Sequence, residues 1–450
     1  MFEKILVANR GEIAVRIIRA CREMGISTVA VCSEADKDAL HAQLADESVC
    51  IGPDVAKDSY LNMERILAAA VATGADAIHP GFGFLSENSR FAALCERCGI
   101  TFIGPSTQSM ENMGNKSKAR NTMKRAGVPV IPGTREPVVN AQEGKALADE
   151  IGYPVIIKAV SGGGGKGMRL VENASDFIEK FETAKRESKN AFGDDSMYIE
   201  KFIGNARHIE FQILADKFGN VIHLGERDCT IQRRHQKVIE EAPSIVLNED
   251  LRKAMGKAAV KAAKAAEYYS AGTIEFLLDK ANKFYFMEMN TRIQVEHPVT
   301  EMVTGVDLIK EMIRIADGQK LAIKQSAVNI NGHAIEFRIN AESPENGFMP
   351  RPGKVTDLHF PGGNGIRIDS ALYTGYHVPS FYDAMIAKVI VHGKNRAEAI
   401  DKMRSALGEV VINGEGLETN VDFLYDLVCN KSFIKGDAEA VNDILEKMCK

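Results

Sequence analysis

The sequence predicts a multidomain protein that combines α/β and α+β folds. The chain has 450 residues, more than one hydrophobic core normally organises, so several domains are expected. Its first hundred residues alternate apolar strands with amphipathic helices, the pattern of a parallel α/β sheet. Its last part places alternating strands before helices rich in Ala, Leu and Glu, which is typical of an α+β domain.

The composition is that of an ordinary globular protein, with 45% hydrophobic and 26% charged residues. A formal charge of -5 gives no reason to expect a nucleic-acid or membrane partner. No apolar run is long enough for a membrane helix, and the N-terminus lacks a signal-peptide pattern. The eight cysteines are scattered, as expected of reduced thiols, and the Cys95–Cys98 pair has no partners for a zinc site. We therefore expect a cytoplasmic location.

The first domain is predicted to be a βαβ structure with a parallel sheet. KILVAN forms a strand, the next segment a helix that ends at Gly25, and STVAVC a second strand. The turn after the first strand begins with Asn9 and is not a G-x-G-x-x-G sequence, which argues against dinucleotide binding. ADAIHPGFGFLSEN and ITFIGPS each place a turn at the carboxyl end of a strand, where such sheets bind ligands.

A glycine loop follows a predicted helix over residues 106–127. YPVIIKAVSGGGGKGMRLV predicts a strand, a loop over 162–167 and a second strand, with Lys158 in the first strand. No Ser or Thr follows Lys166, so the loop is not a Walker P-loop, and the signatures of protein kinases are missing. The pattern favours a β-hairpin flap over nucleotide phosphates; the rival is a flexible linker, against which the apolar flanking strands argue.

Further strands are predicted over residues 197–240. In MYIEKFI, Glu200 and Lys201 follow the pattern of a sheet edge that could meet an adenine. In RHIEFQILAD, alternation places His208, Glu210 and Gln212 on one face. In QRRHQKVIEEAP it places Arg233, His235 and Lys237 on one face, a basic row close to a phosphate loop.

The segment EMNTRIQVEHPVT (288–300) carries the densest set of metal- and anion-binding groups. A hairpin through residues 279–283 would pair GTIEFLL with FYFMEMN, so that Glu275 and Glu288 face one another. With Asn290 they offer the hard oxygen ligands that suit Mg²⁺. Arg292, Gln294 and Glu296 follow at alternate positions and could hold a small oxyanion and take a proton from it. The rival interpretation is a solvated polar edge of a sheet.

The last domain begins near residue 331. HAIEFRINAE alternates, with His333, Ile335, Phe337 and Ile339 on one face and Glu336, Arg338 and Asn340 on the other. We therefore expect Arg338 to face a polar surface or cleft.

Together these segments resemble the biotin carboxylase family. VANRGEIAVRIIRA, HPGFGFLSEN, KAVSGGGGKGMR, ERDCTIQRRHQKVIEEAP, EMNTRIQVEHPVTE and HAIEFRINAE carry the resemblance, which covers essentially the whole chain. It implies a Rossmann-like N-terminal domain (1–104), an ATP-grasp domain (105–330) with a mobile lid at about 131–203, and an α+β C-terminal domain (331–450).

The resemblance also implies roles for individual residues. ATP contacts would come from Lys116, Lys158, the backbone near Gly164 and Gly165, Glu200, Lys201, Ile203, His208, Gln232, His235, Glu275, Leu277 and Glu288. The metal, Mg²⁺ with Mn²⁺ as an alternative, would be bound by Glu275, Glu288 and Asn290. Bicarbonate would be held by Lys237, Arg292, Gln294 and Val295. Glu296 would take its proton, and Arg338 would stabilise the enolate of biotin.

The implied reaction is ATP- and bicarbonate-dependent carboxylation of biotin through carboxyphosphate. The sequence has no Ala-Met-Lys-Met attachment site, so biotin is expected on a separate biotin carboxyl carrier protein, with a carboxyltransferase subunit as the further partner. Such assemblies include the acetyl-CoA carboxylase of fatty acid biosynthesis and two-subunit pyruvate carboxylase, and the carboxyltransferase selects acetyl-CoA, propionyl-CoA or pyruvate. The family also implies a homodimer, to which Arg16, Arg19 and Glu23 would contribute.

Two alternatives remain open at the level of sequence. Another carboxyphosphate-forming ATP-grasp ligase would share the flap and the metal carboxylates but not the RIQVEHP and EFRINAE pair. A non-catalytic nucleotide-binding module would need neither Glu296 nor Arg338.

Overall fold

A computed structural model describes residues 1–134, 136–160, 167–234 and 236–448 of the chain. The chain divides into two compact units. Unit 1 comprises Met1–Glu111, His208–Ile274 and Asn290–Lys450, and unit 2 comprises Asn112–Arg207 and Glu275–Met289.

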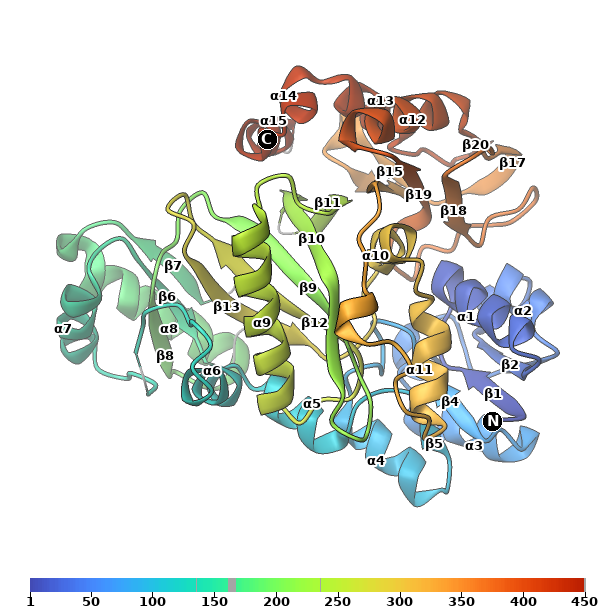
Figure 1. The fold of residues 1–450 in the computed structure, drawn as a ribbon, viewed down its shortest axis with the longest axis horizontal. Coiled ribbons are helices and arrows are strands. Elements are labelled where there is room, and N and C mark those ends of the chain that lie inside the picture. Colours follow the sequence, from blue (N-terminus) through green and yellow to red (C-terminus); the bar gives the residue numbers. More distant parts are fainter. Residues whose placement is uncertain (135, 161–166, 235, 449–450) are drawn as a thin grey trace. The chain divides into compact units, whose positions relative to one another are not determined.

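Unit 1 begins with a five-stranded parallel sheet in the order β3-β2-β1-β4-β5, drawn in blue in Figure 1. Ile5 and Val7 of β1 share a buried core with Ile13 and Ile17 of α1, which explains the apolar spacing of both elements. The predicted parallel βαβ arrangement is confirmed. The elements are β1 (Lys4–Val7), α1 (Gly11–Glu23), β2 (Ser27–Cys32), α2 (Leu40–Leu44), β3 (Glu47–Cys50), α3 (Met63–Thr73), β4 (Ala77–His79), α4 (Ser89–Arg97) and β5 (Thr101–Phe102).

A second, larger sheet crosses unit 1 in the order β12-β9-β10-β11-β14-β19-β18, to which β12 contributes its first residues. Helix α9 lies along β10 (Figure 1). The elements are β9 (Arg207–Ala215), β10 (Val221–Arg233), β11 (Gln236–Ala242), α9 (Glu249–Ala265), β12 (Ser270–Leu278), α10 (His297–Thr304), α11 (Leu308–Ala316), β14 (His333–Asn340), β18 (Ile366–Ser370) and β19 (Met385–Gly393).

The predicted alternation in β14 is confirmed. Ile335, Phe337 and Ile339 are fully buried in the core of the C-terminal region, so Glu336 and Arg338 project from the opposite face. The remaining elements of this region are β15 (Glu342–Ser343), β16 (Met349–Pro350), β17 (Lys354–His359), α12 (Arg396–Glu409), β20 (Val411–Glu415), α13 (Val421–Cys429), α14 (Lys431–Lys435) and α15 (Ala438–Met448).

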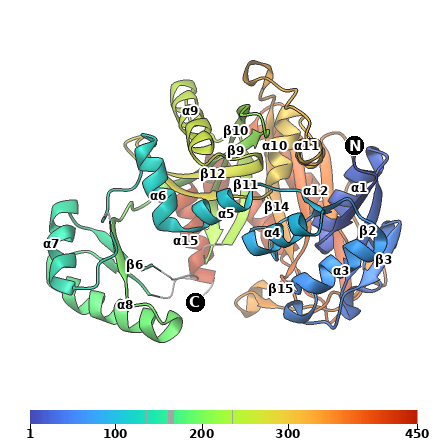
Figure 2. The ribbon, with the colours of Figure 1, turned by 90° about the horizontal axis from the view of Figure 1, so that it is seen from below.

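Unit 2 is built on a three-stranded antiparallel sheet in the order β7-β6-β8. Val155, Ile157 and Ile199 from this sheet pack with Phe177 and Phe181 of α8, which lies alongside β6 in Figure 2. The predicted strands on both sides of the glycine loop are thus confirmed. The elements are α6 (Lys116–Arg125), α7 (Ala141–Ile151), β6 (Val155–Ala159), β7 (Met168–Val171), α8 (Phe177–Phe192), β8 (Met197–Lys201), the end of β12 and most of β13 (Phe284–Asn290).

Two local predictions were wrong. The helix expected over 106–127 is two helices, α5 (Thr107–Gly114) and α6, because Asn115 is extended and its side chain accepts a hydrogen bond from the N–H of Lys118. Of the expected basic row, Arg233 and Lys237 lie on different strands, β10 and β11, and Arg234 after β10 has a left-handed backbone (φ 49°). His235 lies outside the described residues. Lys237 of β11 is paired in register with Gln232 of β10, so it does not follow Arg233 along one strand.

Within the described residues, no helix combines the length and apolar character needed to span a membrane. The seven cysteines among them are all free, and Cys95 is buried in α4 with Cys98 at its C-cap, so the predicted helical setting of this pair is confirmed.

Candidate active site

The segment after β13 leaves the sheet instead of continuing as a strand. β13 ends at Asn290, and α10 begins at His297 with Pro298 in its first turn. The alternation expected for Arg292, Gln294 and Glu296 therefore does not hold, and each of these side chains reaches a different set of partners. The partners described below lie in unit 1.

Glu296 is a buried carboxylate held between two cations. Lys237 of β11 donates to its Oε1 at 2.5 Å, and Arg338 of β14 donates to its Oε2 at 3.0 Å. Burial raises the pKa of Glu296, but Lys237, Arg338 and Arg227 together outweigh this effect and the net pKa is lowered. The carboxylate is thus ionised at neutral pH and able to accept a proton.

Arg227, which the sequence reasoning did not single out, is the hub beneath this pair. It is fully buried in β10 and donates to Gln294 (2.7 Å) and to Glu210 (2.6 Å), with further bonds to Gln212, Thr273 and Thr300. Glu210 also accepts a hydrogen bond from Lys237 at 2.6 Å. Its segment, GERDCTI, is polar around Arg227, so nothing in the sequence signals that this arginine is buried.

Arg292 contacts a residue that follows a strand of the N-terminal parallel sheet. Its Nε donates to Glu87 at 2.9 Å, and the backbone N–H of Thr291 donates to the same carboxylate. Glu87 lies in the HPGFGFLSEN turn, at the strand end where ligand contacts were expected. One carboxylate thereby orients the guanidinium and leaves part of it exposed.

Arg338 contacts a second acid, Glu240 of β11, which is fully buried. The net pKa of Glu240 is raised to about 7. Burial raises it most, Arg338 lowers it, and Glu296 raises it. Glu336 lies opposite Glu240 in the strand register, and burial raises its pKa well above the ordinary value. Arg338 is therefore bordered by acidic side chains on two strands.

Two of the predicted nucleotide contacts of unit 1 lie together. The Nε2 of Gln232 lies 3.1 Å from the Nδ1 of His208, and the Nε2 of His208 lies 3.6 Å from Glu210, as the alternation in β9 predicted. Asn290 is buried, and its side-chain oxygen accepts a hydrogen bond from Arg292 at 3.2 Å. His235 lies outside the described residues.

Unit 2 carries most of the predicted ATP-binding residues. Lys158 of β6 donates to Glu200 of β8 at 2.7 Å, which follows from the pairing of these strands. The ammonium group of Lys201 instead donates to the carbonyls of Gly152 and Tyr153. Lys116 is exposed at the first position of α6. Gly164 and Gly165 lie outside the described residues.

The predicted metal carboxylates of unit 2 lie on neighbouring strands. Glu275 is buried in β12, and Glu288 is partly buried in β13, which is adjacent in the sheet. Asp279 pairs with Lys283 across the connecting turn, as expected of a hairpin. Leu277 on β12 and Ile203 after β8 are both partly exposed. Two carboxylates on paired strands are suitable oxygen donors for Mg²⁺.

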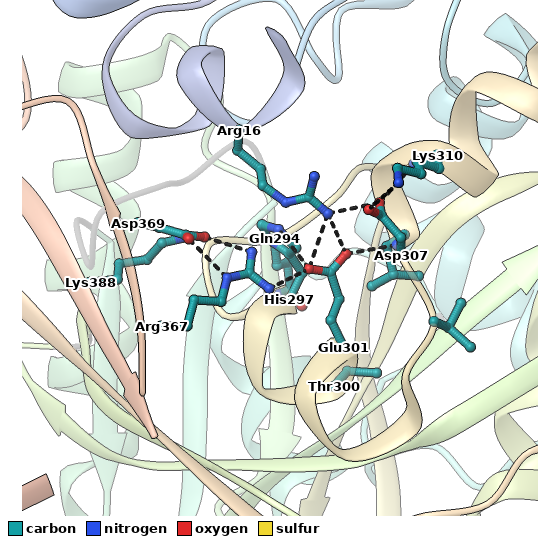
Figure 3. A network of polar contacts seen from close by, with 12 residues as sticks. Arg16, Gln294, His297, Thr300, Glu301, Asp307, Lys310, Arg367, Asp369 and Lys388 are labelled. Atoms are coloured by element: carbon teal, nitrogen blue, oxygen red, sulfur yellow. Dashed lines mark hydrogen bonds and ion pairs between the residues drawn. The ribbon is translucent and has the colours of Figure 1, made fainter. Parts of the chain in front are cut away.

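A buried ionic network extends from the same loop to α1, within unit 1 (Figure 3). Glu301 of α10 accepts hydrogen bonds from Arg16 (3.0 Å) and Arg367 (2.7 Å), and Arg367 also binds Asp369. Arg16 also binds Asp307. Of the residues expected at a dimer interface, Arg16 is thus engaged within its own chain. Glu23 is exposed on α1 and pairs with Lys310 at 2.6 Å, and Arg19 is exposed on the same helix.

Three family models match successive parts of the chain. The model "Biotin carboxylase, N-terminal domain" matches residues 1–110, and "Biotin carboxylase C-terminal domain" matches residues 336–443. Between them, "Carbamoyl-phosphate synthase L chain, ATP binding domain" matches residues 115–324. The middle model is named after another ligase, so the two outer models distinguish the family.

Relatives that match nearly the whole chain support the same family. Biotin carboxylase 1 of Bacillus subtilis is 58% identical over 97% of this chain and 97% of its own. The crystal structure of a biotin carboxylase-beta-gamma-ATP complex from Campylobacter jejuni has a TM-score of 0.92 at 52% identity, covering 97% of both chains. The biotin carboxylase domain dimer of Hydrogenobacter thermophilus 2-oxoglutarate carboxylase, solved with MgADP, ADP and bicarbonate, has a TM-score of 0.91 at 51% identity, covering 97% of this chain and 96% of that chain.

Proposed function

Because the chain belongs to the biotin carboxylase family, we propose that it carboxylates biotin, using ATP and bicarbonate. Its architecture is that of the family, with N-terminal, ATP-grasp and C-terminal domains, and its enzyme class is an ATP-dependent ligase. The observation that carries the proposal is the ionised Glu296 between Lys237 and Arg338. A nucleotide-binding module without chemistry would have no use for a buried base between two cations.

The unit 1 residues are suited to bicarbonate. Arg292, Gln294 and Lys237 supply one guanidinium, one amide and one ammonium group, which together can hold a small oxyanion. Glu296 then takes the proton of bicarbonate, and the resulting carbonate attacks the γ-phosphate of ATP to give carboxyphosphate and ADP. Arg227 holds the Gln294 oxygen in place, so that this amide is oriented before the anion arrives.

The second half of the reaction uses the same cluster. Carboxyphosphate gives CO₂ and phosphate, and phosphate takes the ureido proton of biotin. The enolate formed attacks CO₂, and Arg338 balances its negative charge. Because Arg338 is buried and paired with Glu240 and Glu296, it stays ionised and its position is defined before biotin binds.

The unit 2 residues are suited to ATP. Lys116 and Lys158 would contact the phosphates, and Glu200, Lys201, Ile203 and Leu277 would border the adenine. Glu275 and Glu288 of unit 2, together with Asn290, the last residue of β13, would bind Mg²⁺, which when bound neutralises charge on the phosphates. The fit rests on the donor set, since two of these groups are carboxylates on neighbouring strands and the third is an amide oxygen.

We further propose that the biotin is carried by a separate biotin carboxyl carrier protein and that carboxybiotin passes to a carboxyltransferase subunit. The Hydrogenobacter relative is a homologous domain of a 2-oxoglutarate carboxylase, so related chains serve enzymes with different acceptors. That relative is a domain dimer, which supports a homodimer here. Arg19 and Glu23 on the exposed face of α1 would take part in it.

The test is ATP hydrolysis by the purified chain with Mg²⁺ and bicarbonate, with and without a large excess of free biotin. Hydrolysis that depends strongly on both bicarbonate and biotin is the expected result. Dependence on bicarbonate alone would favour another carboxyphosphate-forming ligase. ATP binding without hydrolysis would favour a nucleotide-binding module.

A further inference from the structure

Lys388 is a fully buried lysine that no part of the proposed reaction uses. It lies in β19, opposite Arg338 of β14 in the strand register, so it is the next charged side chain along the sheet from the active site. Its ammonium group donates to the backbone carbonyl of Val295 at 2.8 Å. The same group lies 3.1 Å from Glu12 of α1 and 3.8 Å from Asp369 of β18.

The contact with Val295 places Lys388 directly behind the proposed bicarbonate loop. Val295 lies between Gln294 and Glu296, whose side chains carry two of the proposed roles. The preceding carbonyl is held as well, because Gln294 O lies 2.8 Å from the Nδ1 of His297. Burial lowers the pKa of His297 well below its ordinary value, so the ring is neutral and Nδ1 donates as an N–H. Two successive carbonyls are therefore bound by buried side chains.

Because a peptide bond is rigid, these two contacts also fix the orientation of the neighbouring N–H groups. A trans peptide is planar, so its C=O and N–H groups point in opposite directions. Holding the carbonyls of Gln294 and Val295 against His297 and Lys388 fixes the N–H groups of Val295 and Glu296 on the other side of the loop. The backbone of Val295 is one of the groups proposed to bind bicarbonate.

The charges around Lys388 explain why it stays in place. Glu12 and Asp369 are buried, and Arg367 also binds Asp369 with two hydrogen bonds. A buried ammonium with two acids and one carbonyl has little freedom to move, because leaving would strand unpaired charges. Lys388 is thus anchored by α1 and β18 while it contacts the loop.

We propose that Lys388 is a positioning residue for bicarbonate: it fixes the Val295–Glu296 peptide, and with it the loop that carries the anion contacts and the base. This inference rests on the proposed function. Its specific consequence is that weakening the Lys388 contact impairs the use of bicarbonate more than the use of ATP, whose proposed contacts lie mainly in unit 2.

The test compares a charge-balanced double variant with two controls. Lys388→Met with Glu12→Gln removes the donor and one buried acid together, and Asp369 keeps Arg367 as its partner. Glu12→Gln alone keeps the lysine and its bond to Val295. Lys402→Met removes another lysine that donates to a backbone carbonyl, that of His392 at 2.8 Å, away from the loop.

The double variant is expected to raise the KM for bicarbonate about tenfold, as loss of one buried hydrogen bond implies, and to leave the KM for ATP within about twofold. Both controls are expected to keep both constants near those of the unmodified chain. An unchanged KM for bicarbonate, or an equal rise in both constants, would overturn the inference.

A second variant covers the case in which the double variant does not fold. Lys388→Arg keeps the positive charge for Glu12 and Asp369 but moves the donor, so the same selective rise in the KM for bicarbonate is expected at a smaller size. Equal KM values in Lys388→Arg and the unmodified chain would then overturn the inference. Failure of the proposed function is distinguishable, because the unmodified chain itself would lack bicarbonate-dependent hydrolysis.

Discussion

Glu296 shows how a single side chain acquires its role from its surroundings. A glutamate at the start of a helix is ordinary in sequence, but here the carboxylate is almost fully buried and its pKa is set by opposing effects. Burial favours the neutral acid, and Lys237 and Arg338 favour the ion. Because the cations prevail, the group is a carboxylate at neutral pH.

Glu296→Gln tests this role while conserving the shape of the side chain. We expect bicarbonate-dependent ATP hydrolysis to fall by about 10² to 10⁴, the usual contribution of a general base. Lys237 retains Glu210 as a partner, so the affinity for Mg-ATP is expected to stay close to that of the unmodified chain. The measurement is steady-state hydrolysis together with nucleotide binding by calorimetry.

Glu342→Gln is the matched control for that variant. Glu342 is also a buried glutamate, bound by Arg233 at 2.9 Å, but Arg233 has no part in the proposed reaction. Hydrolysis by Glu342→Gln should remain near normal. Near-normal turnover in Glu296→Gln would instead remove the assigned base.

Glu241 provides a pH-dependent test of a structural ion pair. Burial raises its pKa, but the hydrogen bonds from Arg396 (2.7 Å) and the contact with His333 (2.8 Å) outweigh burial and lower the pKa to about 2. A carboxyl with a lowered pKa in the folded state adds stability above its unfolded pKa of about 4.5, and this contribution is lost as the pH falls towards about 2.

Glu241→Gln is therefore expected to lower the free energy of unfolding by roughly 3 kcal/mol at neutral pH. The difference from the unmodified chain should shrink steadily below about pH 4.5. Urea unfolding of both proteins at a series of pH values measures it. A difference that is constant with pH would show that the carboxylate is not selectively stabilised in the folded state.

At the scale of elements, the break between α5 and α6 determines where Lys116 lies. The extended Asn115 starts a new helix, and Lys116 takes its first position instead of lying within a continuous helix. Helix N-termini carry partial positive charge and unpaired N–H groups, so a basic side chain there adds to a phosphate-binding end. The same break explains why a helical pattern with good spacing did not form one helix.

Asn115→Ala removes the side-chain cap and should cost about 1 kcal/mol of stability. It should also raise the KM for ATP, because Lys116 loses its fixed starting position. Asn395→Ala is a matched control, since Asn395 caps α12 through the N–H of Glu398 at 3.0 Å, in unit 1. That variant should lose similar stability in thermal unfolding with no change in the KM for ATP. A rise in both variants would assign the effect to stability alone.

At the scale of the whole molecule, the proposed roles divide between the two compact units. The proposed bicarbonate and biotin residues belong to unit 1, as do the proposed nucleotide contacts His208 and Gln232. Most of the other proposed ATP contacts and the two metal carboxylates belong to unit 2. This division has a measurable consequence, because substitutions in the two units should impair different binding steps.

Glu288→Ala in unit 2 is expected to weaken Mg-ATP binding at least about tenfold, since a carboxylate ligand is lost from the proposed metal site. The affinity should recover in part at high Mg²⁺. Arg338→Ala in unit 1 is the counterpart: it should abolish biotin carboxylation and leave Mg-ATP binding nearly unchanged. Normal Mg-ATP affinity in Glu288→Ala would contradict the paired-carboxylate site.

The sequence by itself determined the parallel sheet of the N-terminal region, the strands flanking the glycine loop, the hairpin of β12 and β13 and the two faces of β14. It did so because each depends on local periodicity and turn chemistry, which neighbouring residues encode. Glu296 and Arg338 were also singled out from the alternation of their segments, and Lys237 from an expected basic row, while the roles proposed for them come from the resemblance to a known family.

Only the tertiary structure decided which charges meet. Glu296 lies 59 residues from Lys237 and 42 from Arg338 along the chain, and the hub Arg227 and the buried Lys388 have no local signal for their partners. Such contacts depend on the order and register of β10, β11, β14 and β19, and on a loop that leaves β13. The electrostatic energy of a buried charge depends on the partners that folding brings within a few ångströms. Its protonation state and role are therefore decided where distant segments pack.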